Sequence, residues 1–454
     1  MKKSMKKGLA LLTTTALLAG TLAACGKDEE KPTAGKGDSS SKFSGTLDVA
    51  VFEGGFGTKF WEEAEKQFEE LYPDVDVVLN ASPNIGDVVR PKIAAGDPPD
   101  FIYHSAQNAK SVAKALIKDK NLVDLTDVFS KPAPGEKTPI KEKMLDGFLE
   151  TSGAAPYGDG KVYLAPLYYN LTGLWYNKAL FAEKGWEVPK TVDQFLALGK
   201  EAKKEGKALF TYQGQSPAYL EAVIWPLIAS NGGAEAVSNI FTYGEGAWDN
   251  EAVTGALKLF EDLGKSGDVL KGTVAMNHIQ SQTEHLKGSA LFAPNGNWYE
   301  GEMKDAVQDG WEWGFMAPPV TNESDDQYVT TMIEEMYIPG QSDNIETAKE
   351  FMRFLYSDGM IELNSKESGA VIPVKNGVEI AKPYIPASNY DSFKIFDQGV
   401  KPIIVAWETV ANSEINMNDE VYTKVGSVVN GETTAAEWAK SLEKSSEKVR
   451  KVKE

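Results

Sequence analysis

Short apolar runs alternate with amphipathic stretches once the chain has passed residue 43. The runs of strand length, each closed by turn residues, are 47–52, 75–79 and 101–103. Apolar side chains recur at helical spacing, opposite a charged face, in residues 58–71 and less regularly in 86–95. We assign Thr58 as the first N-cap, because its hydroxyl can accept from a free N–H of the helix. This order of elements predicts an α/β fold with a parallel, doubly wound sheet.

The same pattern predicts where a ligand would bind. In doubly wound sheets, ligands lie beyond the carboxyl ends of the strands. Residues 53–57 follow the first predicted strand, and residues 104–107 follow the third. We therefore expect Glu53, Phe56 and His104 at one rim of the sheet.

Length and composition favour two domains. The chain has 454 residues, 42% of them hydrophobic, with 10 Trp, 17 Tyr and 19 Phe. A chain of this length exceeds what one core normally supports, and its aromatic content is sufficient for two. No segment beyond the N-terminal one has the pattern of a membrane span.

The N-terminal segment, residues 1–24, has the pattern of a cleaved leader. Its lysines at positions 2, 3, 6 and 7 precede residues 8–23, which are uncharged and apolar or small. This run is too short to span a bilayer, which takes about 20 residues. It is typical of a secretory signal peptide.

The leader ends at a sequence that resembles a bacterial lipobox, Leu22-Ala23-Ala24-Cys25. Cys25 is the single cysteine, so no intramolecular disulfide can form. We expect lipidation at Cys25 and anchoring by acyl chains to the outer face of a Gram-positive-type cell membrane. A chance cysteine after an ordinary signal peptide is the alternative. Residues 25–42 lack large apolar side chains and predict a flexible linker.

The balance of charge excludes nucleic acid as a partner. The formal net charge is −19, and no basic patch with interleaved aromatic residues occurs. His278 and His285, two of the three histidines, have no cysteine beside them and form a poor zinc site. No phosphate-binding P-loop motif is present. We expect a monomer with no cofactor and no metal.

Seven segments carry a resemblance to a known family: 94–102, 165–170, 174–178, 188–195, 225–233, 287–298 and 338–351. In this order they resemble the extracellular solute-binding proteins of carbohydrate ABC importers, the family that includes maltose-binding protein. The resemblance implies a periplasmic-binding-protein-like α/β fold of two lobes. Each lobe would be a mainly parallel sheet flanked by helices, and a three-segment hinge would join the lobes.

The resemblance also implies boundaries and a mechanism. It places lobe one at 43–166 and 319–356, and lobe two at 167–318 and 357–454, with residues 314–319 as the second crossing. A receptor of this kind closes on its ligand about the hinge. It would then deliver an oligosaccharide to ABC permease subunits that are served by a separate ATPase.

Sugar rings require flat aromatic faces, and their hydroxyl groups require amide or carboxylate partners. The resemblance makes Trp298 the main stacking residue, and the loop before it contains Asn295 and Asn297. The segment implied at the hinge adds Tyr168, Tyr169 and Asn170.

The other candidates each have a structural alternative. Glu53 could instead pair with a helix dipole. His104 lies where maltose-binding relatives carry a stacking tryptophan, but it could be a buried structural histidine. Trp407 and Asn418 lie in a C-terminal region that matches the family poorly. The polar and aromatic loop expected to supply one or two contacts contains Tyr212, Gln213, Gln215 and Tyr219. We predict structural roles for Trp225, Trp248, Trp311 and Trp313.

Residues 52–57, which include Phe56, and residues 90–92 look most like the N-acetylglucosamine and diacetylchitobiose branch of the family. We therefore predict a chito-oligosaccharide ligand, with Asn170, Asn295 or Asn297 as the amide partner of an N-acetyl group. Another oligosaccharide or an oligopeptide is the nearest alternative.

A secreted glycoside hydrolase acting on chitin fragments is the alternative of a different class. It would require two carboxyl groups about 5–10 Å apart. Candidates exist in Glu334 with Glu335, in Glu53 and in Asp100, but among 66 acidic residues such pairs are expected by chance. Glu334 and Glu335 are also neighbours in a strand and therefore point to opposite faces. We therefore predict that the protein is not an enzyme.

Overall fold

The computed structural model describes residues 43–108, 110–151, 153–408, 410 and 413–453. The predicted signal peptide, Cys25 and the predicted linker lie outside these residues. Within the described ranges, no helix combines the length and the apolar character needed to cross a membrane.

The strands confirm the predicted pattern and extend it. They are β1 (Gly45–Phe52), β2 (Val75–Ser82), β3 (Phe101–Tyr103), β4 (Ala165–Asn177), β5 (Ala208–Phe210), β6 (Ala290–Gly296), β7 (Trp313–Met316), β8 (Tyr328–Tyr337) and β9 (Lys401–Ile404).

Helices separate most of these strands, as an α/β fold requires. The α-helices are α1 (Lys59–Leu71), α2 (Ile85–Ala94), α3 (Ala113–Lys118), α4 (Thr126–Ser130), α5 (Ile140–Lys143), α6 (Lys178–Lys184), α7 (Val192–Lys204), α8 (Glu221–Gly232), α9 (Ala234–Phe241), α10 (Glu251–Ser266), α11 (His278–Leu286), α12 (Tyr299–Met303), α13 (Ile345–Leu355), α14 (Asp358–Ser368), α15 (Gly377–Ala381), α16 (Ala387–Phe393), α17 (Met417–Glu420), α18 (Val425–Val429) and α19 (Ala435–Lys453). The 3-10 helices are η1 (Pro217–Leu220), η2 (Thr273–Ala275), η3 (Lys304–Ala306) and η4 (Lys394–Gln398).

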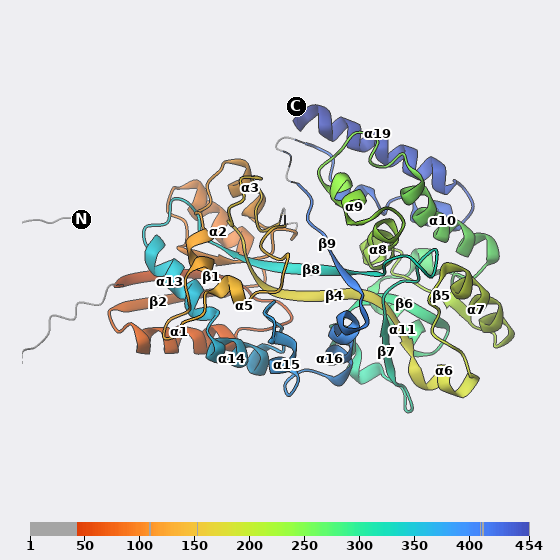
Figure 1. Ribbon diagram of the computed structural model, residues 1–454, viewed down its shortest axis with the longest axis horizontal. Helices are drawn as coiled ribbons and strands as arrows, with labels where there is room; N and C mark the ends of the chain where they lie inside the picture. Colours follow the sequence, from red (N-terminus) through yellow and green to blue (C-terminus); the bar gives the residue numbers. More distant parts are fainter. Residues whose placement is uncertain (1–42, 109, 152, 409, 411–412, 454) are drawn as a thin grey trace, which may run out of the picture. The chain divides into compact units, whose positions relative to one another are not determined.

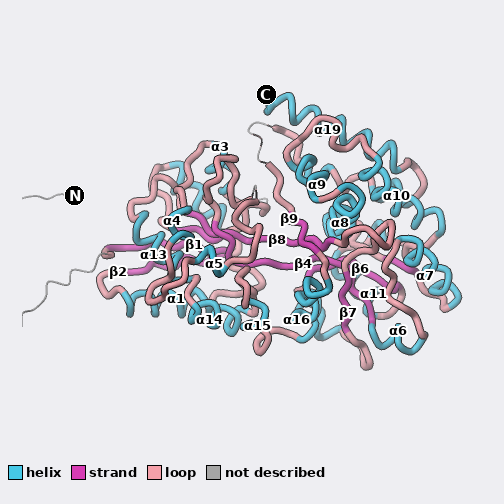
Figure 2. Tube along the Cα trace, in the orientation of Figure 1, coloured by secondary structure: helices cyan, strands magenta, loops and turns pink. Residues whose placement is uncertain are grey.

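The strands form one mixed sheet in the order β2-β1-β3-β8-β4-β6-β5, and helices lie on both sides of it (Figure 2). β1 pairs in parallel with β2 and β3, as predicted for the N-terminal part. The long strands β4 and β8 pair antiparallel to each other. β7 joins the edge of β4, and β9 joins β8.

Helix starts follow from local sequence in some places only. Thr191 caps α7, because its hydroxyl accepts from Gln194 N while the Gln194 side chain accepts from Thr191 N. Thr58 precedes α1 as predicted, but its hydroxyl donates to Glu62 Oε1 at 2.7 Å instead of capping the backbone.

Two core clusters lie at opposite ends of β4 and β8 (Figure 1). The first contains apolar side chains of β1, β3, α1, α13 and α14, and we call this end lobe one. The second contains those of α8, α10 and α19 with β5 and β6, and we call this end lobe two. Trp225 and Trp248 are fully buried in the second cluster, which confirms their predicted structural role.

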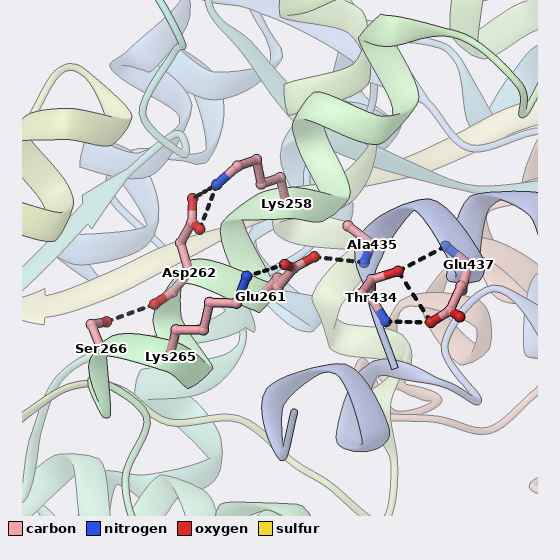
Figure 3. A network of polar contacts seen from close by, with 8 residues as sticks. All are labelled: Lys258, Glu261, Asp262, Lys265, Ser266, Thr434, Ala435 and Glu437. Atoms are coloured by element: carbon pink, nitrogen blue, oxygen red, sulfur yellow. Dashed lines mark hydrogen bonds and ion pairs between the residues drawn. The ribbon is translucent and has the colours of Figure 1, made fainter. Parts of the chain in front are cut away.

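Helix α19 packs against α10 in lobe two (Figure 3). Glu261 of α10 accepts from the backbone N–H of Ala435 at 2.8 Å and also pairs with Lys265. Trp438 of α19 packs its ring 5.9 Å from Phe260. The long C-terminal helix is mostly polar, but it buries Trp438, Leu442 and Val449 in the second cluster.

The crossings between the lobes differ from the boundaries that we predicted. β7 pairs with β4, and Val320 pairs with Thr191, so residues 313–320 still belong to lobe two. The second crossing is therefore made by β8 and not by residues 314–319. Helix α14 and the side chains of Ala370, Ile372 and Val374 pack in the first cluster, so the chain returns to lobe two after residue 374 instead of at 357. Strand pairing, which joins residues far apart in the chain, determines where the crossings lie.

Candidate functional site

The middle of β4 lies between the two lobes. We call the face that it forms with β8 the floor. Tyr168, Asn170 and Thr172 alternate along the strand and therefore share one face. They pair in register with Glu334, Met332 and Thr330 of β8, which extend the same face. Thr172 also pairs with Gly296 of β6, so the segment that contains Trp298 begins beside this floor.

At the lobe-one end of the floor, protein groups pair both carboxyl groups, while the buried hydroxyl of Tyr168 has no partner among the described residues. Tyr168 packs its ring 5.0 Å from Phe56, and Tyr103 donates its hydroxyl hydrogen to Glu334. Burial raises the pKa of Glu334, although the bond from Tyr103 acts in the opposite direction. The carboxylate of Glu335 accepts from Ala106 N at 3.0 Å, and burial raises the pKa of Glu335 to about 8.

At the lobe-two end lies Glu221, which sequence reasoning did not select. It begins α8 and accepts from the hydroxyl of Thr172 at 3.4 Å, while the hydroxyl of Thr330 donates to its backbone carbonyl at 2.7 Å. Burial raises the pKa of Glu221 to about 7. A single acid before an otherwise apolar helix was the sequence signal that could have identified it.

The end of β6 presents two buried amides. Asn295 and Asn297 are 0% and 3% exposed. Asn295 Oδ1 accepts from Gly296 N at 2.8 Å, and this bond leaves Nδ2 as the free donor. Among the described residues, Asn295 Nδ2 and Asn297 Oδ1 have no hydrogen-bond partner. Buried polar atoms of native proteins are normally paired, so this donor and acceptor are suited to an external partner.

Two aromatic rings form a corner at the end of β6. Tyr219 of η1 and Trp298, which precedes α12, meet at an interplanar angle of 66° with 6.3 Å between ring centroids. Both side chains are half-buried. The ring of Trp298 lies over Gly296, where an added Cβ would stand 2.3 Å from it. We call Tyr219 and Trp298 the aromatic corner.

A polar cluster contacts the aromatic corner through Tyr219. The His278 ring stacks on Tyr219 with 4.8 Å between centroids. His278 Nε2 lies 2.9 Å from Glu302 Oε2, and Gln282 Nε2 donates to the same oxygen at 2.7 Å. Burial would raise the pKa of Glu302, but the bonds from His278 and Gln282 outweigh it and lower the pKa. Sequence analysis considered His278 only as a metal ligand and missed Glu302.

Other predicted residues lie apart from this group. Tyr169 points to the opposite face of β4, where it packs on Phe148 and Phe393. His104 is 2% exposed with its ring stacked 5.2 Å from Phe52, and burial lowers its pKa. Glu53 is exposed at the end of β1.

The remaining candidates are held by protein contacts of their own. Gln215 is exposed and donates to Ala275 O at 2.8 Å. Trp407 donates its indole N–H to Asn418 Oδ1 at 3.1 Å and packs beside Trp225. Ligand contact by any of the predicted residues stays a prediction.

A groove of about 930 Å³ lies elsewhere, between segment 126–162 of lobe one and α9 with β9 of lobe two. None of the predicted site residues lines it. In the part of the chain that the structure describes, no group of three or more His, Cys, Asp or Glu side chains could hold a metal ion.

Two lobes joined by long strands, with aromatic rings and unpaired amides beside them, define a two-lobed binding protein. The chain belongs to the bacterial extracellular solute-binding proteins, because the family model of that description matches residues 53–362. Trp298 and the floor strands β4 and β8 lie within the matched region.

Comparisons with individual proteins agree with this assignment. The chain is 26% identical over 441 residues to the diacetylchitobiose binding protein NgcE of Streptomyces coelicolor, covering 93% of this chain and 90% of that protein. It is 24% identical to the multiple sugar-binding protein of Streptococcus mutans, covering 81% and 83%.

Solved structures agree on the fold. The bacterial solute receptor AcbH superposes with a TM-score of 0.70 at 17% identity, covering 90% of this chain and 99% of that one. A chitin oligosaccharide binding protein superposes with a TM-score of 0.62 at 18% identity, covering 87% and 95%. At these identities, the structures show the fold alone.

Proposed function

We propose that this protein is the lipid-anchored receptor of a sugar ABC importer and that it captures chito-oligosaccharides. Binding would close the two lobes about β4 and β8, and the loaded form would dock on permease subunits served by a separate ATPase. Membership of the solute-binding family and similarity to a diacetylchitobiose binding protein support this function.

The pair of free amide atoms on Asn295 and Asn297, which precede Trp298 in the chain, carries the proposal. An N-acetyl group offers one N–H donor and one carbonyl acceptor. Asn297 Oδ1 would accept from this N–H, and Asn295 Nδ2 would donate to this carbonyl. Trp298 would cover the apolar face of a sugar ring. A sugar without the acetamido group would leave both buried amide atoms unpaired.

The alternative of a glycoside hydrolase is weaker. Glu334 accepts from Tyr103 and Glu335 from Ala106. Neighbours in β8 point to opposite faces, so the two carboxyl groups do not flank a common bond. Retaining and inverting mechanisms both require two carboxyl groups on either side of one glycosidic bond.

Calorimetric titration of the purified protein with diacetylchitobiose and with cellobiose tests the proposal. Cellobiose is the matched control, because it has the same linkage and carries hydroxyl groups where the acetamido groups stand. We expect saturable binding of diacetylchitobiose and at least about tenfold weaker binding of cellobiose. Equal binding of both would remove the acetamido specificity but keep a sugar receptor. Turnover of the chitin fragment would establish an enzyme instead.

A further inference from the structure

The two rings of the aromatic corner stand on separate elements that are not adjacent in the chain. Tyr219 belongs to η1, and Trp298 lies at the N-terminus of α12. An aromatic platform binds a sugar well only if its rings keep their angle without the ligand, because ordering them on binding costs affinity. The contacts that hold the angle of 66° therefore contribute to sugar affinity.

His278 contacts both sides of the corner. Its ring stacks on Tyr219 at an interplanar angle of 25°. Its Nε2 atom reaches Glu302, which lies in the same first turn as Trp298, since Glu302 N donates to Trp298 O at 3.0 Å. The chain of contacts runs from one ring through His278 and Glu302 to the backbone of the other ring.

Gln282 completes the link. It lies one turn after His278 on α11, is 1% exposed, and its Nε2 atom contacts both His278 Nε2 at 2.9 Å and Glu302 Oε2 at 2.7 Å. Helix α11 itself begins with a capping box of Asn277 and Gln280, which fixes the position of His278 at its first residue. The three polar side chains thus join α11 to α12.

We propose that His278, Gln282 and Glu302 are positioning residues that set the angle between Tyr219 and Trp298 for stacking on a sugar ring. This inference rests on the proposed function for its ligand. The shape of the corner comes from protein contacts that exist without ligand. The three side chains do not have to touch the sugar.

The alternative is that this cluster only stabilises lobe two. A structural role would change the unfolding free energy without moving the Trp298 ring relative to Tyr219. A positioning role would move the ring and weaken sugar binding while the fold persists. His278 is 27% exposed and Glu302 41% exposed in their side chains, so neither change removes a core residue.

The test uses His278→Ala, His278→Phe and Glu302→Gln in the full-length protein, with Glu284→Gln as the matched control. Glu284 lies on the same helix and pairs with Lys287 at 2.9 Å, away from the corner. The measurements are the Kd for diacetylchitobiose by calorimetry and the fluorine resonance of Trp298 in fluorotryptophan-labelled protein. Trp298→Phe assigns that resonance.

We expect His278→Ala to weaken binding about tenfold or more and to shift the Trp298 resonance. His278→Phe restores the stack on Tyr219 and should recover part of the affinity. Glu302→Gln keeps an acceptor oxygen and should lose less than His278→Ala. Glu284→Gln should change neither measurement.

An unchanged Trp298 resonance and an unchanged Kd in both His278→Ala and Glu302→Gln would overturn the positioning role. If the unaltered protein binds no sugar, the proposed function fails. The resonance then still decides whether the cluster orients Trp298, because this measurement requires no ligand. Misfolding of His278→Ala, seen by circular dichroism, leaves the decision to Glu302→Gln, whose side chain has nearly the same size.

Discussion

Buried polar groups at the two ends of β4 and β8 differ in their hydrogen-bond partners. At the lobe-one end, Glu334 and Glu335 are buried and accept from Tyr103 and from Ala106 N. At the lobe-two end, Asn295 and Asn297 are as deeply buried, but among the described residues one amide atom of each lacks a partner. The two carboxyl groups are therefore paired without ligand, whereas the two amide atoms, like the buried hydroxyl of Tyr168 at the lobe-one end, would be paired only by a bound ligand. Both lobes are therefore expected to contact the ligand, with the amide contacts in lobe two.

The largest expected effect concerns Glu335 at the lobe-one end. Its pKa rises from 4.5 to about 8 on folding, so the folded state holds the proton more tightly than the unfolded chain does. This contribution is fully present below about pH 4.5 and is lost as the pH rises to about 8. The unaltered protein should therefore lose on the order of a few kcal/mol of unfolding free energy between pH 5 and pH 8. Glu335→Gln should lack this loss and thus gain stability relative to the unaltered protein as the pH rises.

Denaturant unfolding at both pH values measures this difference. Glu284→Gln serves as control, because salt bridging lowers the pKa of Glu284 and places its pH effect in the acid range. Equal pH dependence of Glu335→Gln and the unaltered protein would show that the lobe-one carboxyl group is not protonated on folding. The contrast between the two ends would then fail.

The next effect concerns the aromatic corner. Trp298→Ala should weaken diacetylchitobiose binding by on the order of 2 kcal/mol, or about 30-fold in Kd, because it removes the apolar face on which the sugar stacks. Trp311→Phe is the control, since Trp311 packs with Trp313 and His285 away from the corner. If calorimetry finds the same loss in both variants, Trp298 has no special part in binding.

A smaller effect separates the acetamido contact from stacking. Asn297→Ala should weaken diacetylchitobiose binding by about 1 kcal/mol, or roughly fivefold, and leave cellobiose binding nearly unchanged. The matched control is Asn322→Ala, because Asn322 is exposed and pairs with Asp325. Calorimetry with both sugars measures the difference. Equal losses for the two sugars would place Asn297 at a hydroxyl group common to both.

The smallest effect is expected for two tyrosines, one in lobe one and one in lobe two. Tyr103→Phe should lower the unfolding free energy by about 0.5–1 kcal/mol, because it removes the donor to a buried carboxyl group. Tyr212→Phe should be neutral or raise it by up to about 1 kcal/mol, because the buried Tyr212 hydroxyl has no partner among the described residues. Urea unfolding of both variants measures the pair. A loss from Tyr212→Phe equal to that from Tyr103→Phe would contradict the comparison.

Local patterns alone predicted much of the fold. The three N-terminal strands and their parallel pairing follow from periodicity and the order of elements, which are properties of neighbouring residues. The structural roles predicted for Trp225 and Trp248 are confirmed by their full burial.

For the candidate site, the sequence by itself determined the types of residue and one region: Trp298, the amides before it and the tyrosines of β4. Tertiary structure alone decided which of them meet. It turned Tyr169 to the opposite face, covered His104 with Phe52, and brought Glu221, His278 and Glu302 into the group from distant segments. The physical reason is that strand register and helix packing set the distance between side chains far apart in the chain. Periodicity in one chain carries no information about those distances.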